Sequence, residues 1–253
     1  MFKDSKSETV IYWASAQPSS ETYDLNHLYP GVKSLYEETV AKKVSLKDNL
    51  NDFIRCPAFS DLAKNTFVHR APVETHAKLD FSRKRANHIF ENSLDETKYR
   101  VKLEFMREPT IEGHNLIQYS WPIVFFSEEE SMMATLTAPY FERTESSQYG
   151  MVVPGRFDIG KWFRPMNMEF QLWEGVSEMK IAANEALCYI HFDTDKKIVF
   201  KKFIMTREID KLLVSILRAS PYRRFARLSD RYRVFEQSQS KQRVLKLIQK
   251  QLI

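Results

Sequence analysis

The stretch at residues 98–106, KYRVKLEFM, alternates apolar and charged side chains along most of its length. Its apolar side chains fall on one face, at Tyr99, Val101, Leu103 and Phe105. Alternation with a period of two is the pattern of a β-strand that is buried on one face only. The stretch therefore predicts sheet structure for the middle of the chain.

Short strand-like segments continue from this stretch to residue 206. They lie at residues 116–126, 132–137, 149–153, 166–173, 179–182, 186–192 and 197–205. Pro122 interrupts the first of them, which predicts an edge position or a bulge. Many short strands with turn residues between them indicate antiparallel sheets. We expect an α+β, β-dominated protein, with a jelly-roll-like sandwich over residues 98–206.

The N-terminal segment, residues 1–97, has a weaker pattern and is expected to wrap the sandwich as an irregular segment. Residues 9–15, TVIYWAS, are rich in β-forming residues and predict one strand. Residues 46–53 predict a short helix, residues 56–59 predict a turn, and residues 64–72 predict a strand that ends at Pro72. The polar residues 82–97 are expected to form a surface loop.

Residues 207–253 change to a helical pattern. Apolar side chains recur three and four positions apart, at Ile209, Leu212, Leu213, Ile216 and Leu217. This spacing predicts an amphipathic helix capped by Thr206, with further helices at residues 222–237 and 241–252. The segment has 12 Lys or Arg against 4 Asp or Glu, a net charge of +8. The other 206 residues have 26 Lys or Arg against 29 Asp or Glu, a net charge of −3. The body is therefore slightly acidic, although the whole chain has a net charge of +5.

The basic helical segment has two interpretations. One is docking on the acidic body, or self-association into a homo-oligomer. Its interface residues would be Leu212, Leu213, Ile216, Arg223, Arg224 and Arg227. The other is nucleic-acid binding, because arginines interleaved with aromatic rings suit phosphate contact and base stacking. Long arginine stems also cover apolar surface, so docking or self-association is preferred.

Composition limits the class of protein. The chain has 253 residues, of which 43% are hydrophobic and 28% charged, which is ordinary for a globular protein with a real core. The longest apolar runs are too short to cross a bilayer, and the first ten residues lack the apolar core of a secretory signal. Cys56 and Cys188 are expected to be buried, reduced thiols, which favours a cytoplasmic location.

Motifs for catalysis and metal binding are scarce. His191 and Asp193 form an H-x-D pair, but a two-His, one-carboxylate iron site needs a later histidine and His191 is the last one. Cys56 with His69 as its base is a weaker alternative to an inert thiol. The glutamates at residues 128–130 are expected to form a solvated turn. The nucleophile-elbow, P-loop and dinucleotide-binding motifs do not occur, so we expect no metal and no cofactor, and catalysis is not favoured.

Residues 152–173, VVPGRFDIGKWFRPMNMEFQLW, combine aromatic rings with charged side chains. One interpretation is that the rings fill the core and that an Arg156–Asp158 ion pair shapes the loop. Polar groups beside rings in a loop on a rigid sheet are also a common form of binding site. The candidate binding residues are Arg156, Asp158, Lys161, Trp162 and Arg164.

Four strings in the chain resemble an uncharacterised protein family of tailed bacteriophages. They are IYWASAQPSS, RCPAFSDLAKNTFVHRAP, WPIVFFSEEE and VVPGRFDIGKWFRP. The β region also resembles a cupin-type jelly roll without its metal ligands. The resemblance implies a non-catalytic phage accessory or host-takeover protein that binds a host or virion protein, or a small ligand. The alternatives are an enzyme on a metal-free scaffold and a nucleic-acid-binding protein.

Overall fold

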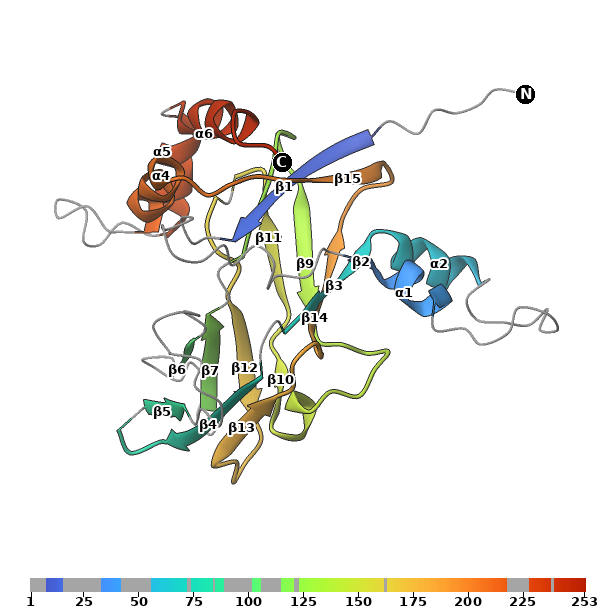
Figure 1. The fold of residues 1–253 in the computed structure, drawn as a ribbon, viewed down its shortest axis with the longest axis vertical. Helices are drawn as coiled ribbons and strands as arrows, with labels where there is room; N and C mark the ends of the chain where they lie inside the picture. The colour runs from blue at the N-terminus through green and yellow to red at the C-terminus, as the bar shows by residue number, and fades with distance from the viewer. Residues whose placement is uncertain are drawn as a thin grey trace.

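The structure is a computed structural model of the 253-residue chain. It describes residues 8–15, 33–41, 56–71, 74–83, 85–88, 102–105, 115–120, 123–161, 163–217, 228–237 and 239–253. Strands dominate these parts, with helices at two places on the outside (Figure 1). The described helices are all too short or too polar to cross a membrane. The structure thus confirms the β-dominated α+β class.

The described strands form four small sheets. The β1 sheet has the order β15 (Lys197–Lys202), β1 (Glu8–Ser15), β8 (Ile123–Ser127). The β14 sheet has the order β11 (Gly155–Asp158), β9 (Met133–Thr137), β14 (Ala186–Phe192), β3 (Thr66–Arg70), β2 (Lys33–Ser34). The β12 sheet has the order β10 (Gly150–Val152), β12 (Met168–Leu172), β7 (Asn115–Ser120), β6 (Lys102–Phe105). The β4 sheet has the order β13 (Glu178–Ile181), β4 (Thr75–Asp80), β5 (Arg85–His88).

This arrangement does not confirm the jelly-roll-like sandwich. The strands are divided among four sheets, and β1 runs parallel to β15 while it is antiparallel to β8. A parallel neighbour requires a long connection, and the paired residues Glu8 and Lys197 are 189 positions apart in the sequence. Strand periodicity shows that a segment is a strand, but it does not show which strand it pairs with.

A single hydrophobic core joins the four sheets. It takes Trp13 from the β1 sheet, Phe67 from the β14 sheet, Phe170 from the β12 sheet and Met179 from the β4 sheet. Aromatic rings connect the first two sheets directly, since the ring centres of Phe67 and Phe200 lie 4.6 Å apart. The sheets are therefore parts of one body.

Strand β1 is buried on both faces. Ile11 and Trp13 point into the shared core, whereas Tyr12 and Ala14 belong to a second core on the opposite face. The neighbouring β8 is divided in the same way. A strand covered on both sides reads as an almost continuous apolar run, as TVIYWAS does. The sequence identified this strand and could not show that it is central.

Three C-terminal helices cover the outer face of the β1 sheet. They are α4 (Arg207–Leu217), α5 (Leu228–Gln237) and α6 (Ser240–Gln249). Ile209, Leu213, Phe235, Val244 and Ile248 are buried against Tyr12, Ala14, Val124 and Phe126. The expected cap of α4 is present, because the Ile209 amide donates to Thr206 Oγ1 at 3.4 Å. The helices of residues 207–253 are thus docked on the body of their own chain.

Two further helices, α1 (Leu35–Ala41) and α2 (Pro57–Lys64), cover the outer face of β3 and β14. A reciprocal capping box starts α1. The Glu37 amide donates to Ser34 Oγ, the Ser34 amide donates to the Glu37 carboxylate, and both bonds are 3.1 Å long. Pro57 starts α2 at a position where its missing amide hydrogen costs nothing.

Several local expectations need correction. Residues 1–97, expected to be irregular, supply β1 to β5, α1 and α2, so three of the four sheets contain strands from this segment. Strand β5 falls inside the expected loop at residues 82–97. The expected strand at residues 116–126 is two strands, β7 and β8, which belong to different sheets. These strands are decided by tertiary pairing, which local composition does not report. The helix expected at residues 46–53 lies outside the described residues.

The docking of α6 predicts a large effect of Ile248→Ala, which removes a fully buried side chain between α6 and the β1 sheet. We expect the free energy of unfolding to fall by about 2–5 kcal/mol. Lys246→Ala, two positions away on the exposed side of α6, is the matched control and should change it by less than about 0.5 kcal/mol. Urea denaturation followed by circular dichroism measures both. Equal effects of the two variants would contradict this packing.

Candidate functional site

Charged side chains of the candidate loop at residues 155–164 form ion pairs with other residues of the same chain. Arg156 Nη2 donates to Asp193 Oδ2 at 2.7 Å, so the expected Arg156–Asp158 pair is replaced by a pair with the β14–β15 turn. Lys161 Nζ lies 3.6 Å from the carboxylate of Glu236 on α5. Trp162 lies outside the described residues, and Arg164 is half-buried. Ion pairs therefore join the loop to the β14–β15 turn and to α5.

Asp158 organises the turn that follows β11. Its carboxylate accepts hydrogen bonds from the amides of Met132 and Gly160, both at 3.0 Å, and from Ser131 Oγ at 2.8 Å. A Cβ atom on Gly160 would lie 2.6 Å from the carbonyl oxygen of Glu129. Two turns are therefore held against each other too closely for any side chain at this glycine.

Most of the described rings and apolar side chains of residues 152–173 belong to the cores. Ile159 and Phe163 are fully buried and Met166 nearly so, and the ring centres of Phe126 and Phe163 are 5.1 Å apart. Trp173 is the exception, at 41% exposed. The aromatic density that pointed to a binding loop is largely explained by packing.

The glutamates of residues 128–130 form a turn in which Glu128 and Glu130 are exposed, as expected, and which is also anchored by polar contacts. Tyr12 donates a hydrogen bond to Glu128, and burial together with this bond raises the pKa of Tyr12 to about 12. Lys196 donates to the Glu129 carboxylate at 2.7 Å, which lowers the pKa of Glu129. Lys241 of α6 donates to the Glu129 carbonyl oxygen at 2.7 Å. This turn ties the tail to the body by polar contacts.

The tail residues singled out from the sequence face the chain's own body where they are described. Leu213 is buried and Leu212 is partly buried against the outer face of β1 and β8. The side chain of Ile216 lies outside the described part, as do Arg223, Arg224 and Arg227. Apolar docking of the tail within one chain therefore uses the surface that self-association would need.

His191 and Asp193 have separate partners. Asp193 is paired with Arg156, and His191 Nδ1 lies 3.0 Å from Thr66 Oγ1. Thr66 donates its hydroxyl hydrogen to the Leu62 carbonyl at 2.6 Å, so Nδ1 of His191 must be the donor to Thr66. The bonds from Leu62 through Thr66 to His191 connect α2 with β3 and β14, and Thr66 is only 1% exposed, so its hydroxyl is not an accessible nucleophile. Within the described ranges, no three His, Cys, Asp or Glu side chains converge as metal ligands.

The two cysteines are free thiols in different environments. Cys56 is exposed just before α2, which corrects the expectation that it is buried. Cys188 is buried, and burial raises the pKa of its thiol far above the usual value. His69, considered as a base for Cys56, is buried in β3. Its backbone lies opposite that of Cys188 in the register between β3 and β14.

An open groove of about 960 Å³ lies between the α1–α2 pair and the turn that joins β14 to β15. Its apolar lining comes from Phe67 and Ile198. Its charged lining includes the carboxylates of Glu37, Asp61, Asp193 and Asp195. The H-x-D pair thus lies in a groove of a size that binds ligands, although its chemistry is not that of a metal site.

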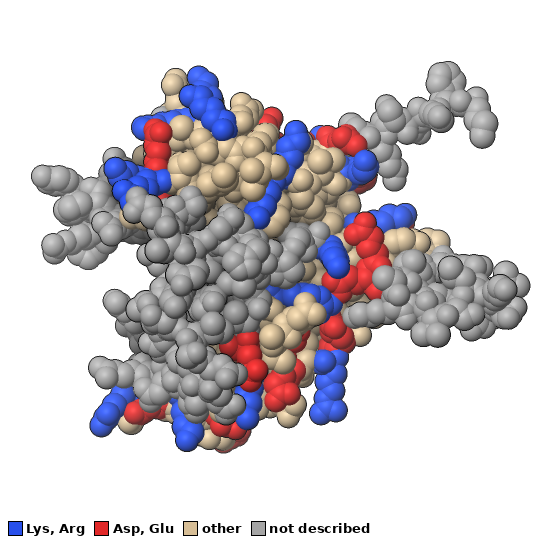
Figure 2. Space-filling model, in the orientation of Figure 1, with Lys and Arg blue, Asp and Glu red and all other residues tan. Residues whose placement is uncertain are grey.

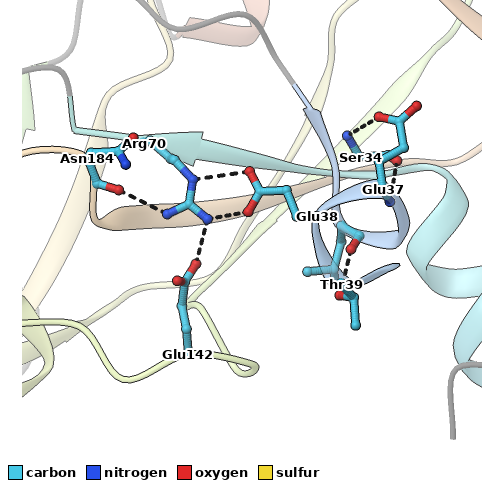
Figure 3. A network of polar contacts seen from close by, with 8 residues as sticks. Ser34, Glu37, Glu38, Thr39, Arg70, Glu142 and Asn184 are labelled. Atoms are coloured by element: carbon cyan, nitrogen blue, oxygen red, sulfur yellow. Dashed lines mark hydrogen bonds and ion pairs between the residues drawn. The ribbon is translucent and has the colours of Figure 1, made fainter. Parts of the chain in front are cut away.

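Arg70 at the end of β3 is the centre of a polar network that the sequence did not reveal (Figure 3). Its guanidinium donates two hydrogen bonds to Glu38 of α1, one to Glu142 at 2.9 Å and one to the Asn184 carbonyl at 2.9 Å. The side chains of Arg70 and Glu38 are only 14% and 11% exposed. Bidentate arginine–carboxylate pairs of this kind fix geometry. The network joins α1, β3 and the loop after β9.

That loop, at residues 138–145, presents exposed rings. Tyr140 is 50% and Phe141 is 43% exposed, and Leu62 of the adjacent α2 is 44% exposed. Phe141 packs edge-on against Phe59 of α2 at 5.0 Å, and Tyr140 against Tyr189 of β14 at 4.8 Å. We call Leu62, Tyr140 and Phe141 the aromatic patch. The sequence signal that was missed is the pair Tyr140-Phe141 directly after Pro139, in otherwise polar surroundings.

Comparison with known proteins adds no relative, since no protein-family model matches the chain and no curated protein matches it.

Removing the Asp158 carboxylate should destabilise the protein. Asp158→Ala leaves two backbone amides and one hydroxyl without their acceptor, so we expect a loss of about 1–3 kcal/mol in the free energy of unfolding. Asp195→Ala, an exposed aspartate in the β14–β15 turn, serves as control and should cost less than about 0.5 kcal/mol. Thermal or urea unfolding of the two variants measures both changes in the free energy of unfolding. A neutral Asp158→Ala would show that the turn does not depend on this carboxylate.

Burial of the His69 ring predicts that the free energy of unfolding falls in acid. Burial lowers its pKa from 6.5 to about 3, so the folded protein keeps the ring neutral while the unfolded chain binds a proton below about pH 6.5. Stability from this group is complete above pH 6.5 and falls as the pH drops toward 3. At pH 5 the loss is about 2 kcal/mol, at roughly 1.4 kcal/mol per pH unit.

The measurement is urea unfolding at pH 7 and pH 5 of the unchanged protein and of His69→Gln. The difference between the two pH values should shrink in the variant. His76→Gln is the control, because His76 lies at 3.2 Å from Glu178 and is not deeply buried. An unchanged pH dependence in His69→Gln would refute the assignment.

Proposed function

We propose that the chain is a non-catalytic binding protein that engages a protein partner through the aromatic patch. The observation that carries this proposal is a set of exposed rings on a loop that buried polar contacts hold in place. Large aromatic side chains are the commonest anchors of protein interfaces. The two rings are 43% and 50% exposed, and a partner would bury the surface that the contacts with Phe59 and Tyr189 leave uncovered.

The loop that carries the rings is preorganised. Glu142, next to Phe141, is held by Arg70, and the amides of Glu145 and Ser146 donate to the Glu185 carboxylate at 2.9 and 3.2 Å. A surface that is already ordered loses less conformational entropy when it binds. This combination distinguishes the patch from singly exposed apolar side chains, which are ordinary on any protein surface.

The loop at residues 155–164 is a weaker candidate for the same role. Asp158, Arg156 and Lys161 each have a partner within the chain. A phage accessory or host-takeover role, implied by the family resemblance, remains part of the proposal, and the partner would then be a host or virion protein. A cytoplasmic location follows from the same expectation.

Nucleic-acid binding through the tail is the second candidate. Its supporting observation is that α6 turns basic side chains outward while its apolar side chains are docked. Blue side chains gather over the helices in Figure 2, and the exposed ones include Lys211, Arg243, Lys246 and Lys250. Arg243 is paired with Glu208 at 3.1 Å, which reduces the charge available to phosphates. We therefore rank this function second.

The test compares Phe141→Ala with Phe81→Ala, which removes a ring that is 37% exposed in the turn after β4. Full-length proteins are immobilised and used to capture proteins from a lysate of the bacterial host. We expect Phe141→Ala to weaken capture of a specific protein by at least about tenfold, as for an interface anchor, while Phe81→Ala does not. Unfolding of both variants should stay within about 1 kcal/mol of the unchanged protein.

A second variant, Glu142→Ala, keeps both rings but releases the loop from Arg70. It should weaken capture less than Phe141→Ala, because only the preorganisation is lost. Capture of the same proteins by Phe141→Ala and by the unchanged chain would disprove the patch as the binding surface.

A further inference from the structure

Strand β15 lies at an edge of the β1 sheet. It pairs with β1 on one side, over the register from Glu8–Lys197 to Trp13–Lys202. Within the parts of the chain that the structure describes, no strand pairs with its other side along residues 197–201. An open edge presents backbone donors and acceptors that an additional strand can use.

Residues 251–253 already form backbone hydrogen bonds at one end of this edge. Phe203 and Leu252 form an antiparallel bridge, the Ile253 amide donates to the Lys202 carbonyl at 3.0 Å, and the Ile204 amide donates to the Gln251 carbonyl at 2.9 Å. The Phe203 amide donates in the other direction, to Trp13 of β1. Residues 251–253 therefore lie on the side of β15 that faces away from β1.

The geometry identifies the backbone groups that have no strand partner within the described residues. Successive residues of a strand direct their amide and carbonyl groups to opposite sides. Because Lys202 and Ile204 bond away from β1, the amides and carbonyls of Ile198 and Phe200 point away from β1 as well. Those of Val199 and Lys201 point toward β1. An antiparallel strand placed in line with residues 251–253 would meet Ile198 and Phe200.

The groove lies at the start of this edge. Ile198 and Phe67 line it, and so does Ser34 of β2, the edge strand of the β14 sheet. The groove thus takes lining residues from two edge strands, and part of its lining is apolar. An extended chain fits such a space better than a compact ligand, because its backbone finds partners along the edge.

Charge favours a basic occupant. Four carboxylates line the groove, at Glu37, Asp61, Asp193 and Asp195. Three lysines line it as well and are paired, Lys64 with Asp61 at 3.4 Å, Lys196 with Glu129 at 2.7 Å and Lys197 with Glu8 at 2.9 Å. Because Asp61 pairs with Lys64 and Asp193 pairs with Arg156, Glu37 and Asp195 are the groove carboxylates without an ion pair among the described residues. Acidic side chains also gather beside α1 and α2 in Figure 2. A basic segment would complement this excess of negative charge.

We propose that the open edge of β15, with the adjoining groove, binds an extended basic peptide segment as an added antiparallel strand. Backbone bonds to Ile198 and Phe200 supply the pairing, Phe67 and Ile198 receive an apolar side chain, and the carboxylates of Glu37 and Asp195 select lysine or arginine. This site is separate from the aromatic patch, although both adjoin α2.

The probe is a fluorescein-labelled seven-residue peptide of alternating Val and Lys, titrated into the full chain with fluorescence anisotropy as readout. Its counterpart of alternating Val and Glu should bind at least about tenfold more weakly. Methylating the amides of one alternate set of residues should abolish binding, while methylating the other set should not, because only one set faces β15. Equal binding of the Lys and Glu peptides, or of both methylated peptides, would overturn the proposal.

Amide hydrogen exchange locates the contact. Addition of the Val–Lys peptide should slow exchange at Ile198 and Phe200 and leave Val199 and Lys201 unchanged, since these already bond to β1. Binding without protection of Ile198 and Phe200 would place the peptide elsewhere and refute the site.

Two protein variants complete the experiment. Asp195→Lys reverses an exposed charge in the groove and should weaken the Val–Lys peptide several-fold without unfolding the protein. Phe141→Ala should leave peptide binding unchanged, so failure of the aromatic patch and failure of this edge are distinguished. Unchanged affinity in Asp195→Lys would count against the electrostatic part of the proposal.

Discussion

The burial of β1 on both faces is the constraint on which the rest of the structure depends. Residues 8–15 pair with β8 on one side and with β15, nearly 190 positions later, on the other. Ile11 and Trp13 then face a core shared by four sheets, and Tyr12 and Ala14 face the helices. A strand with no polar face requires cover on both sides, because exposed apolar surface is unfavourable in water. The C-terminal helices supply that cover, so both ends of the chain are needed for one fold.

This constraint also decides where function can lie. The helices α4 to α6 use their apolar sides on the body, and the loop at residues 155–164 uses Asp158 and Ile159 to close a turn and a core. Among the described residues, the aromatic patch over α2 and the edge of β15 are two features that stay exposed. Both features lie at the edge of the packed core, and each is held in place by contacts with the rest of the chain. The Arg70 network holds the first, and pairing with β1 holds the second.

Prediction from the sequence was accurate where a local pattern has one physical meaning. Strands at residues 9–15 and 186–192 and the Thr206 cap were expected and are present. Prediction of the candidate site was less accurate, because a loop rich in aromatic rings and charged side chains is explained equally by core packing and by ligand binding. The buried Phe163 and the ion pair between Arg156 and Asp193 show that packing explains much of it. Arg70, Glu38 and Glu142 gave no signal, since a network of residues distant in sequence leaves no local pattern.

The sequence by itself determined the class of the protein, its strand periodicity and the helical nature of its C-terminal segment, because these depend on neighbours along the chain. Only the tertiary structure decided the pairing of β1 with β15, the division of β7 from β8 and the direction in which the tail docks. Pairing of strands far apart in sequence depends on which apolar faces can be buried together, and alternation of residues within each strand is the same for every choice of partner.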